Sequence, residues 1–587
     1  MNAFMRHTII SMWLLTCLLY TIDTDVFLFA SLSQTLLGGM CALMMCVFSL
    51  AYGLLNGASW PAGKGVAFVF IWIAYLLCHA SLVAEAEQYK LFYWVIQLVV
   101  MLMLSFLLHN RFLSFRQIEN GLLLMLFLQL SCLLLQTMGF MDSSNPYFRL
   151  TGFGDNPNSV AILIAISIPF LFDRLKESEH TKLILLSIIV AIIYLFVLKC
   201  RTAFIGLGVI CLTRFAFSFH MKKHYMGLGK NKMTVICFVA VILLAVISLA
   251  LYRMKQDSAD GRLLVWKISA KMVADKPLGW GVGMFGKNYN LCQGKYFEAV
   301  GGSEQERTLA DIVNMAYNDY LEQGVESGIL GAFFLITFYI TMIVLAIKKH
   351  ETKALSVFCA FAVMSMISFV YASIQAWMVM ISFAALMLCD ERQTQHRGLG
   401  VLLSMVCIAL CAALLLKYGG MTQSQRKLQS YKTRYEQNES LDVNEIKSLE
   451  KPISTSSEYY LFLADVLMAQ KRYGEAYNAI KAASLYSTEP KVFFLSFICL
   501  EKMGRTAEGV KYIRTFSDIV PQNMTSRNIL LRWYDSRGMI QEALNTALEM
   551  SQTKLKVNNP HAKQIQAGAM YYLEVHRDEM HDYQITK

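Results

Sequence analysis

Long runs of apolar residues alternate with short polar connections through the first 418 residues of the chain. Each run has roughly the length that an α-helix needs to cross a lipid bilayer. The runs lie at residues 8–30, 34–55, 65–84, 88–108, 117–138, 158–173, 182–199, 202–218, 233–252, 326–347, 354–371, 373–389 and 398–418. This pattern predicts a polytopic helical membrane bundle of about 13 spans. The boundaries near Asp23 and Ser373 decide the topology, because the loss of one span would invert part of it.

One long polar segment, residues 253–325, interrupts these runs. Its apolar residues from Gly261 to Pro277 have helical spacing, which predicts a helix lying along the membrane surface. A cluster of glycines follows, where the backbone can approach a ligand closely; these are Gly279, Gly281, Gly283 and Gly286. A second helix is predicted after the glycines and leads into the next span. One face of this helix carries Asn314, Tyr317, Asn318 and Leu321.

The composition changes after residue 418 to that of a soluble helical domain. A linker at 419–455 precedes residues 456–587, in which three similar segments place the small residues Ala476, Gly509 and Ala543 33 and 34 residues apart. This spacing resembles the tetratricopeptide repeat, in which a small residue lets two helices pack closely. The predicted fold is therefore all-α, a membrane bundle followed by an α-solenoid. Such repeats bind proteins, although a helical cap on the membrane domain is the simpler alternative.

Charge and cysteine content refine this picture. Lys and Arg give a formal charge of +11 but gather in short loops on one side of the predicted spans, which marks the cytoplasmic side and leaves no reason to expect nucleic acid. Residues 139–157, 199–201, 253–325 and the part after 418 then lie on the opposite, extracytoplasmic face of the membrane. The 14 cysteines lie mostly in apolar runs without metal-ligand spacing, so we expect neither disulfides nor zinc.

Three polar features fall on that outer face. The turn from Arg149 to Asn158 precedes a span and can cap its helix. Arg201 lies between two spans with almost no loop, where a guanidinium either snorkels to the surface or binds an anion. Arg262 is predicted at the start of the surface helix, where it and the helix N-terminus would bind a phosphate together unless it is only a solvated residue.

The order of these pieces resembles the O-antigen ligase superfamily, which includes O-antigen ligases, protein O-oligosaccharyltransferases and, more distantly, repeat-unit polymerases. The resemblance covers residues 140–335 in motifs and 1–418 in layout. The matching pieces are the Arg149 to Asn158 turn, Arg201-Thr-Ala, Gly261-Arg262 with Trp266, Pro277-Leu-Gly-Trp-Gly-Val-Gly with Phe285, and Asn318-Asp-Tyr-Leu321 followed by Glu326-Ser-Gly328.

The resemblance implies a glycosyltransferase of the C type that needs no metal or other cofactor. Its donor would be an undecaprenyl-diphosphate-linked glycan, and its acceptor lipid A-core, a protein or a growing glycan. Arg201 and Arg262 would bind the diphosphate and stabilise its developing charge, with Arg149 in support. Asn158, Asn318, Asp319 and Tyr320 would contact substrate.

The chain departs from the family at one catalytic position. Where the family commonly has His-Asn, this chain has Tyr317-Asn318, and residues 253–328 contain no histidine. A phenol with a pKa near 10 is a poor base at neutral pH, so Tyr317 is expected to orient the acceptor or sugar. Asp319 or Glu326 would take the proton instead, unless the activated leaving group makes a base unnecessary; Glu326 is otherwise a helix-start charge.

Two other classes of function stay open at this stage. Many spans with polar residues are also typical of a transporter or flippase for a lipid-linked glycan, although we find no duplicated pair of broken helices. A non-catalytic assembly protein that recruits enzymes through its repeats is the third reading. Among the transferase readings, ligation is the prediction, and protein glycosylation and polymerisation are the alternatives.

Overall fold

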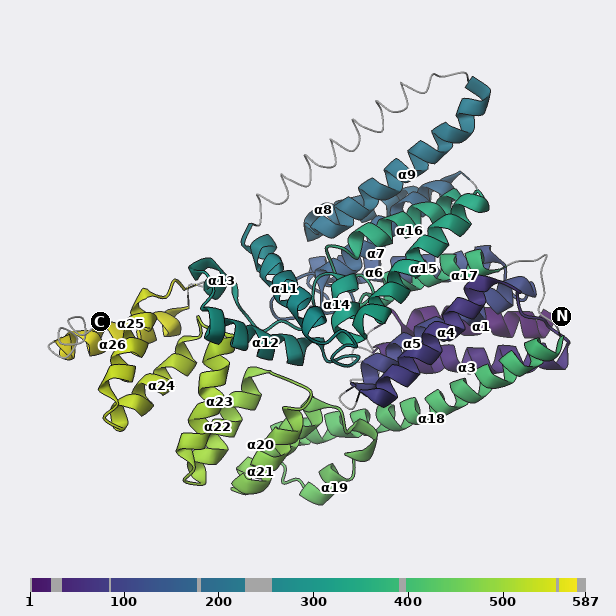
Figure 1. Ribbon diagram of the computed structural model, residues 1–587. Helices are drawn as coiled ribbons and strands as arrows, with labels where there is room; N and C mark the ends of the chain where they lie inside the picture. Colours follow the sequence, from purple (N-terminus) through teal and green to yellow (C-terminus); the bar gives the residue numbers. More distant parts are fainter. Residues whose placement is uncertain are drawn as a thin grey trace. The chain divides into compact units, whose positions relative to one another are not determined.

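The computed structural model describes residues 3–22, 34–83, 86–176, 181–226, 256–389, 397–555 and 559–577. Every regular element in these ranges is a helix (Figure 1). The chain forms two compact units. Unit 1 falls within Met1–Ala84, Gln88–Met254 and Tyr317–Ser430, and unit 2 within Glu85–Glu87, Lys255–Ala316 and Tyr431–Lys587. The polar segment and the C-terminal part of the chain therefore share one unit.

Unit 1 is a bundle of mostly apolar helices. They are α1 (Ala3–Leu19), α3 (Gln34–Leu55), α4 (Lys64–Leu82), α5 (Gln88–His109), α6 (Phe115–Met138), α7 (Pro157–Leu175), α8 (Thr181–Leu198), α9 (Arg201–Met226), α14 (Asp319–Glu326), α15 (Gly328–Lys348), α16 (Thr352–Met364), α17 (Ile374–Leu388) and most of α18 (Arg397–Glu436). In the described part of the chain, eight helices are long and apolar enough to cross a membrane, and α1, α16 and α17 are shorter apolar helices. These helices support a multi-pass membrane protein. The count of 13 spans stays a prediction, and the span expected at 233–252 lies outside the described residues.

Helix α5 is the core of unit 1. It is apolar on all sides, which suits a helix covered by others, and it is buried from Leu91 to its end. It packs against α3, α4 and α17. The aromatic rings of Trp72 and Trp377 lie 6.0 and 5.7 Å from the ring of Trp94 in its second turn. This packing fixes the first turn of α5, which carries Lys90.

Unit 2 combines helices from the polar segment with helices from the C-terminal part. They are α11 (Gln256–Asp275), α12 (Phe285–Val300), α13 (Glu304–Leu309), α19 (Val443–Lys447), the 3₁₀ turn η1 (Lys451–Ile453), α20 (Ser457–Ala469), α21 (Tyr473–Ala483), α22 (Pro490–Lys502), α23 (Thr506–Ile519), α24 (Met524–Ser536), α25 (Ile540–Gln552) and α26 (Pro560–Val575). From α20 to α26 each helix packs on the next.

The three small residues singled out in the sequence lie at helix contacts. Ala476 and Ala543 are fully buried. A Cβ added at Gly509 would lie 3.2 Å from the Cα and carbonyl oxygen of Phe497 in the preceding helix. Close packing within each helix pair therefore requires small side chains. The tetratricopeptide assignment itself stays a prediction.

Helix α12 packs against α23, so the polar segment is anchored on the C-terminal helices. The buried amide of Gln293 donates to the carbonyl of Ile519 at 2.8 Å, and Asn290 donates to the Thr488 hydroxyl at 2.9 Å. Gly294 provides the close approach, because a Cβ there would lie 3.1 Å from the Ile519 side chain. The sequence pattern did not predict this packing.

Three helix boundaries differ from those expected. Helix α11 is already formed at Gln256, so Arg262 lies inside the helix and not at its start. Asn314 and Tyr317 precede α14 and are not helical, because Asn318 caps that helix. Helix α18 continues through Gly419 and the following glycine, each of which costs only about 1 kcal/mol relative to Ala in a helix.

Candidate active site

The polar motifs of unit 1 gather at one end of its bundle. The chain connects α6 to α7 there, and α8 returns to the same end, where it passes into α9. The Thr137 hydroxyl in the last turn of α6 lies 2.9 Å from the Tyr194 hydroxyl in the last turn of α8. The start of α17 joins them, because the Ser373 hydroxyl donates to the carbonyl of Ser159 in the first turn of α7 at 3.3 Å. Arg149, Asn158 and Arg201 therefore lie at a common end.

Two buried glutamines of α6 hold the turn that contains Arg149. The side-chain oxygen of Gln136 accepts from the backbone N–H groups of Thr151 and Gly152, each at 3.0 Å, and its amide donates to the carbonyl of Gly152. Gln129 accepts from Phe153 N–H at 3.0 Å. Gly152 has φ +65°, and a Cβ there would meet the Gln129 oxygen at 2.1 Å, so only glycine fits. The two glutamines were missed because each reads as an isolated polar residue in an apolar run.

The predicted site residues near this turn differ in exposure. Arg149 is exposed, and one guanidinium nitrogen donates to the carbonyl of Thr137 at 3.5 Å. The predicted cap on α7 is confirmed, because the Asn156 side chain accepts from Asn158 N–H at 2.9 Å. Arg201 is half-buried as the first residue of α9, directly after Cys200. The end of the bundle thus carries two arginines that solvent reaches.

Helix α14 is fixed by its own N-terminal residues. The Asn318 side chain caps it and accepts from the N–H groups of Tyr320 and Leu321, both at 3.1 Å. One Asp319 carboxylate oxygen accepts from Val370 N–H at 3.1 Å, and the Tyr320 hydroxyl donates to the carbonyl of Ala362 at 2.9 Å. Burial raises the pKa of Asp319 well above its usual value. These contacts hold α14 against α16 and against the connection between α16 and α17.

Tyr317 lies just before this cap in a strained backbone conformation. Its φ is +52°, in the left-handed region that bulky residues rarely adopt. Its half-buried ring packs edge-on against Phe369 at 5.8 Å. Strain of this kind persists only where the surroundings fix it, and it is frequent at functional sites.

A buried ion-pair cluster joins α14 to α5. Lys90 Nζ lies 2.9 Å from a carboxylate oxygen of Glu322 and 2.8 Å from one of Glu326. The two glutamate side chains are 2% and 0% exposed, and the Tyr371 hydroxyl donates to Glu322. Glu322 and Glu326 share a helix face because they are four residues apart, which is the signal that would have pointed to a common cation. Glu326 is thus a buried, paired carboxylate.

Arg262 belongs to unit 2, where α11 presents it half-buried. The same helix buries Leu264 and Ile268 and holds its position through the Trp266 indole, which donates to the carbonyl of Ala316 at 3.0 Å. The glycine cluster that follows adopts left-handed conformations at Gly279, Gly281 and Gly283, with φ of 94°, 111° and 82°. Glycine tolerates these conformations, whereas the close approach to a ligand expected here stays a prediction.

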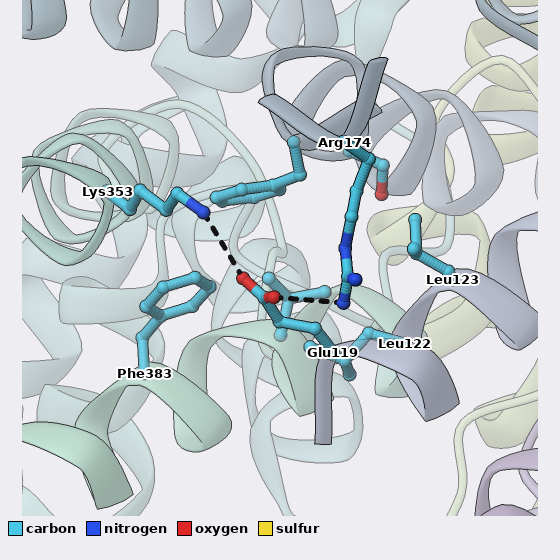
Figure 2. Close-up of a pocket in the computed structure, with 9 residues that line it drawn as sticks. Glu119, Leu122, Leu123, Arg174, Lys353 and Phe383 are labelled. Atoms are coloured by element: carbon cyan, nitrogen blue, oxygen red, sulfur yellow. Dashed lines mark hydrogen bonds and ion pairs between the residues drawn. The ribbon is translucent and has the colours of Figure 1, made fainter. Parts of the chain in front are cut away.

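A second charged cluster lies at the opposite end of unit 1. Glu119 at the start of α6 lies 3.1 Å from Arg174 at the end of α7 and 3.6 Å from Lys353 at the start of α16. Figure 2 shows Glu119 between these two cations, beside the ring of Phe383. They line a small, mostly apolar cavity. Carboxylates thus pair with the positive charges at this end.

The described ranges contain no group of three or more His, Cys, Asp and Glu residues that could hold a metal ion. What the arginine-bearing end offers is positive charge next to hydrogen-bonding side chains. Such an arrangement can bind a phosphate and stabilise it as a leaving group.

Residues 184–336 match the model of a family described as O-antigen ligase. No curated protein matches the chain. The matched segment includes Arg201, Arg262 and all of α14, whereas Arg149 and the C-terminal helices lie outside it. The match supports the resemblance to the O-antigen ligase superfamily and suggests a glycosyltransferase-type activity in a membrane.

Proposed function

We propose that this protein is a membrane glycosyltransferase that ligates a glycan from an undecaprenyl-diphosphate-linked donor to an acceptor on the periplasmic face of the inner membrane. The observation that carries the proposal is the O-antigen ligase match at residues 184–336, which includes both Arg201 and Arg262. The eight apolar helices of spanning length support a membrane location.

The arginines stabilise the diphosphate leaving group in this proposal. An acceptor hydroxyl attacks the anomeric carbon, the bond from that carbon to the diphosphate oxygen breaks, and undecaprenyl diphosphate leaves with the bonding electrons. Arg201 and Arg262 bind the phosphates and stabilise the charge that develops on them, because a guanidinium can donate two parallel hydrogen bonds to phosphate oxygens. Arg149, at the same end of unit 1 as Arg201, adds positive charge.

The residues around α14 bind and orient the substrate in this proposal. Tyr317 orients the acceptor or sugar, and Asn158, Asn318, Asp319 and Tyr320 shape its site. The ion pair of Glu326 with Lys90 and its full burial favour a role in positioning α14 over proton removal. The diphosphate is a good leaving group, so the acceptor proton can pass to solvent or to the departing phosphate without a dedicated base.

Measuring the released lipid diphosphate tests the activity. Purified protein is incubated with a polyprenyl-diphosphate-linked glycan and an acceptor, and free polyprenyl diphosphate and glycosylated acceptor are quantified. We expect stoichiometric release from the wild type and loss of at least about 100-fold with Arg262→Ala or Arg201→Ala, as for removal of one charge-stabilising group at a transition state. Lys271→Ala is the matched control, because Lys271 is an exposed cation on the same helix as Arg262.

Two results would count against the proposal, the first against the transferase activity and the second against the role of Arg262. Transport of intact donor without release indicates a flippase, and near-normal release by Arg262→Ala rejects that arginine. The acceptor follows from the glycans of a deletion strain: loss of long lipopolysaccharide supports ligation to lipid A-core, loss of glycoproteins supports protein glycosylation, and accumulated single repeat units support polymerisation.

A further inference from the structure

A polar groove in unit 2 lies between α13 and the helices α24 and α25. Its volume is about 420 Å³, within the range of roughly 300–1,000 Å³ that is typical of small-molecule sites. Among the described residues that line it, Pro521 is the only apolar one, and none is aromatic. A groove of this composition suits a ligand that is hydrophilic along its whole length.

Arg527 forms the buried part of this groove. The residue is 5% exposed, and its Nε has no hydrogen-bond partner. One terminal nitrogen donates to the Thr553 hydroxyl at 3.3 Å and lies 3.3 Å from a carboxylate oxygen of Glu549, whose side chain is 59% exposed. A buried guanidinium normally has several close partners, because it loses its hydration on burial. This one has a single long ion pair to a carboxylate that remains largely in water.

A second arginine and a lysine add to the positive charge. Arg307 lines the same groove, half-buried, and is held by a hydrogen bond from its guanidinium to the carbonyl of Gly301 at 3.0 Å. Lys554 is exposed at the rim. Burial first and then Arg307 lower the pKa of Arg527, although Glu549 and Asp518 oppose this. Both arginines line one groove, so their positive charges repel each other there.

We propose that this groove binds an acidic saccharide, with a sugar carboxylate between Arg307 and Arg527. A carboxylate there would offset the repulsion between the two guanidinium groups and complete the hydrogen bonding of Arg527. Glu304, Glu549 and Gln552 line the rest of the groove and can accept from or donate to sugar hydroxyls. An acidic peptide matches these acceptors less well, because it offers one backbone N–H per residue and few hydroxyls. The proposal does not depend on the transferase activity.

Calorimetric titration of the full-length protein in detergent with trigalacturonic acid tests this site. We expect saturable binding to the wild type and about tenfold weaker binding to Arg307→Gln and to Lys554→Gln, which each remove one charge-assisted contact. Lys502→Gln is the matched control, because Lys502 is exposed on α22 and does not line the groove. The fully methyl-esterified trisaccharide, which keeps the shape but lacks the charge, is expected not to bind.

Three results would overturn the proposal: no binding of trigalacturonic acid to the wild type, equal binding of the methyl ester, or tighter binding of a glutamate-rich hexapeptide. Thermal unfolding of each variant shows whether it is folded. Arg527 is left unchanged because its burial makes misfolding the expected result of replacing it. Since no step requires glycan transfer, a failure here leaves the proposed function untouched.

Discussion

At the scale of single residues, Lys90 is the side chain of α5 that forms ion pairs with α14 at the arginine-bearing end of unit 1. It pairs with the buried carboxylates of both Glu322 and Glu326, at 2.9 and 2.8 Å. Taking two carboxylates out of water is costly unless a positive charge and hydrogen bonds compensate. Lys90 of α5 therefore adds to the contacts of Asp319 and Tyr320 that hold α14 in place.

Replacing Lys90 by Met is expected to destabilise the protein by about 3 kcal/mol, as for breaking a buried ion pair by removing one partner. The measurement is the thermal unfolding midpoint of purified protein in detergent. Lys64→Met is the control, since Lys64 is exposed at the start of α4. Adding Glu322→Gln to the Lys90 variant is expected to recover part of the loss. Equal midpoints for wild type and Lys90→Met would contradict the role given to this ion pair.

The sequence could not have revealed Lys90, because its partners lie more than 230 residues away. It reads as a residue at the start of a span, where lysines are common. The cap at the start of α7 was easier to predict, because it follows from the short-range capping preference of Asn. The placement of Arg149 and Arg201 at one end of the bundle followed from counting spans.

Among helices, the short α13 shows how a helix terminus can depend on pH. Ser303 caps α13, and Glu306 closes a capping box by accepting from Ser303 N–H at 2.8 Å. Glu306 also pairs with Lys267 of α11 at 2.8 Å and accepts from the Tyr296 hydroxyl of α12. Partial burial opposes ionisation, but these hydrogen bonds outweigh it and lower the pKa of Glu306 to about 2.

The lowered pKa predicts an acid-sensitive contribution to stability. A carboxylate with a depressed folded-state pKa stabilises the protein above its unfolded pKa, and the contribution is lost as pH falls towards the folded value. For Glu306 this window runs from about pH 5 down to about pH 2. Glu306→Gln is thus expected to lower the unfolding midpoint at pH 7 and to differ less from wild type at pH 3.5. A gap that widens in acid would show that another group dominates.

Helix boundaries were predicted less well than helices. Gly419 suggested the end of one helix and Gly261 the start of another. Both glycines instead lie inside their helices, α18 and α11. The cost of a glycine within a helix is about 1 kcal/mol relative to Ala, which packing and the many hydrogen bonds of a long helix exceed. The opposite error occurred before α14, where the helical spacing of Asn314, Tyr317 and Asn318 suggested a helix. The structure begins the helix later, after the Asn318 cap.

For the whole molecule, the predicted topology places unit 2 in the periplasm and the Glu119 cluster at the cytoplasmic side. Single cysteines at Ala299 and Lys176, both exposed, test this in a variant whose native cysteines are replaced. We expect a membrane-impermeant maleimide to label Ala299→Cys in cells with a permeabilised outer membrane and Lys176→Cys only after lysis. Labelling of Lys176→Cys but not of Ala299→Cys in unlysed cells would show that the topology is the reverse of the predicted one. The proposed site would then have no access to a periplasmic donor.

The anchoring of α12 on α23 has a consequence for how this protein can be shortened. Removing the residues after 430 would delete Thr488 and Ile519, and would leave Asn290, Gln293 and the close contact at Gly294 facing water. The part of the chain after residue 430 is thus not a detachable accessory, because the segment that carries Arg262 packs part of its own interior against it. A truncated chain is expected to lose order around residues 285–300, so loss of activity on truncation would not by itself identify a docking module.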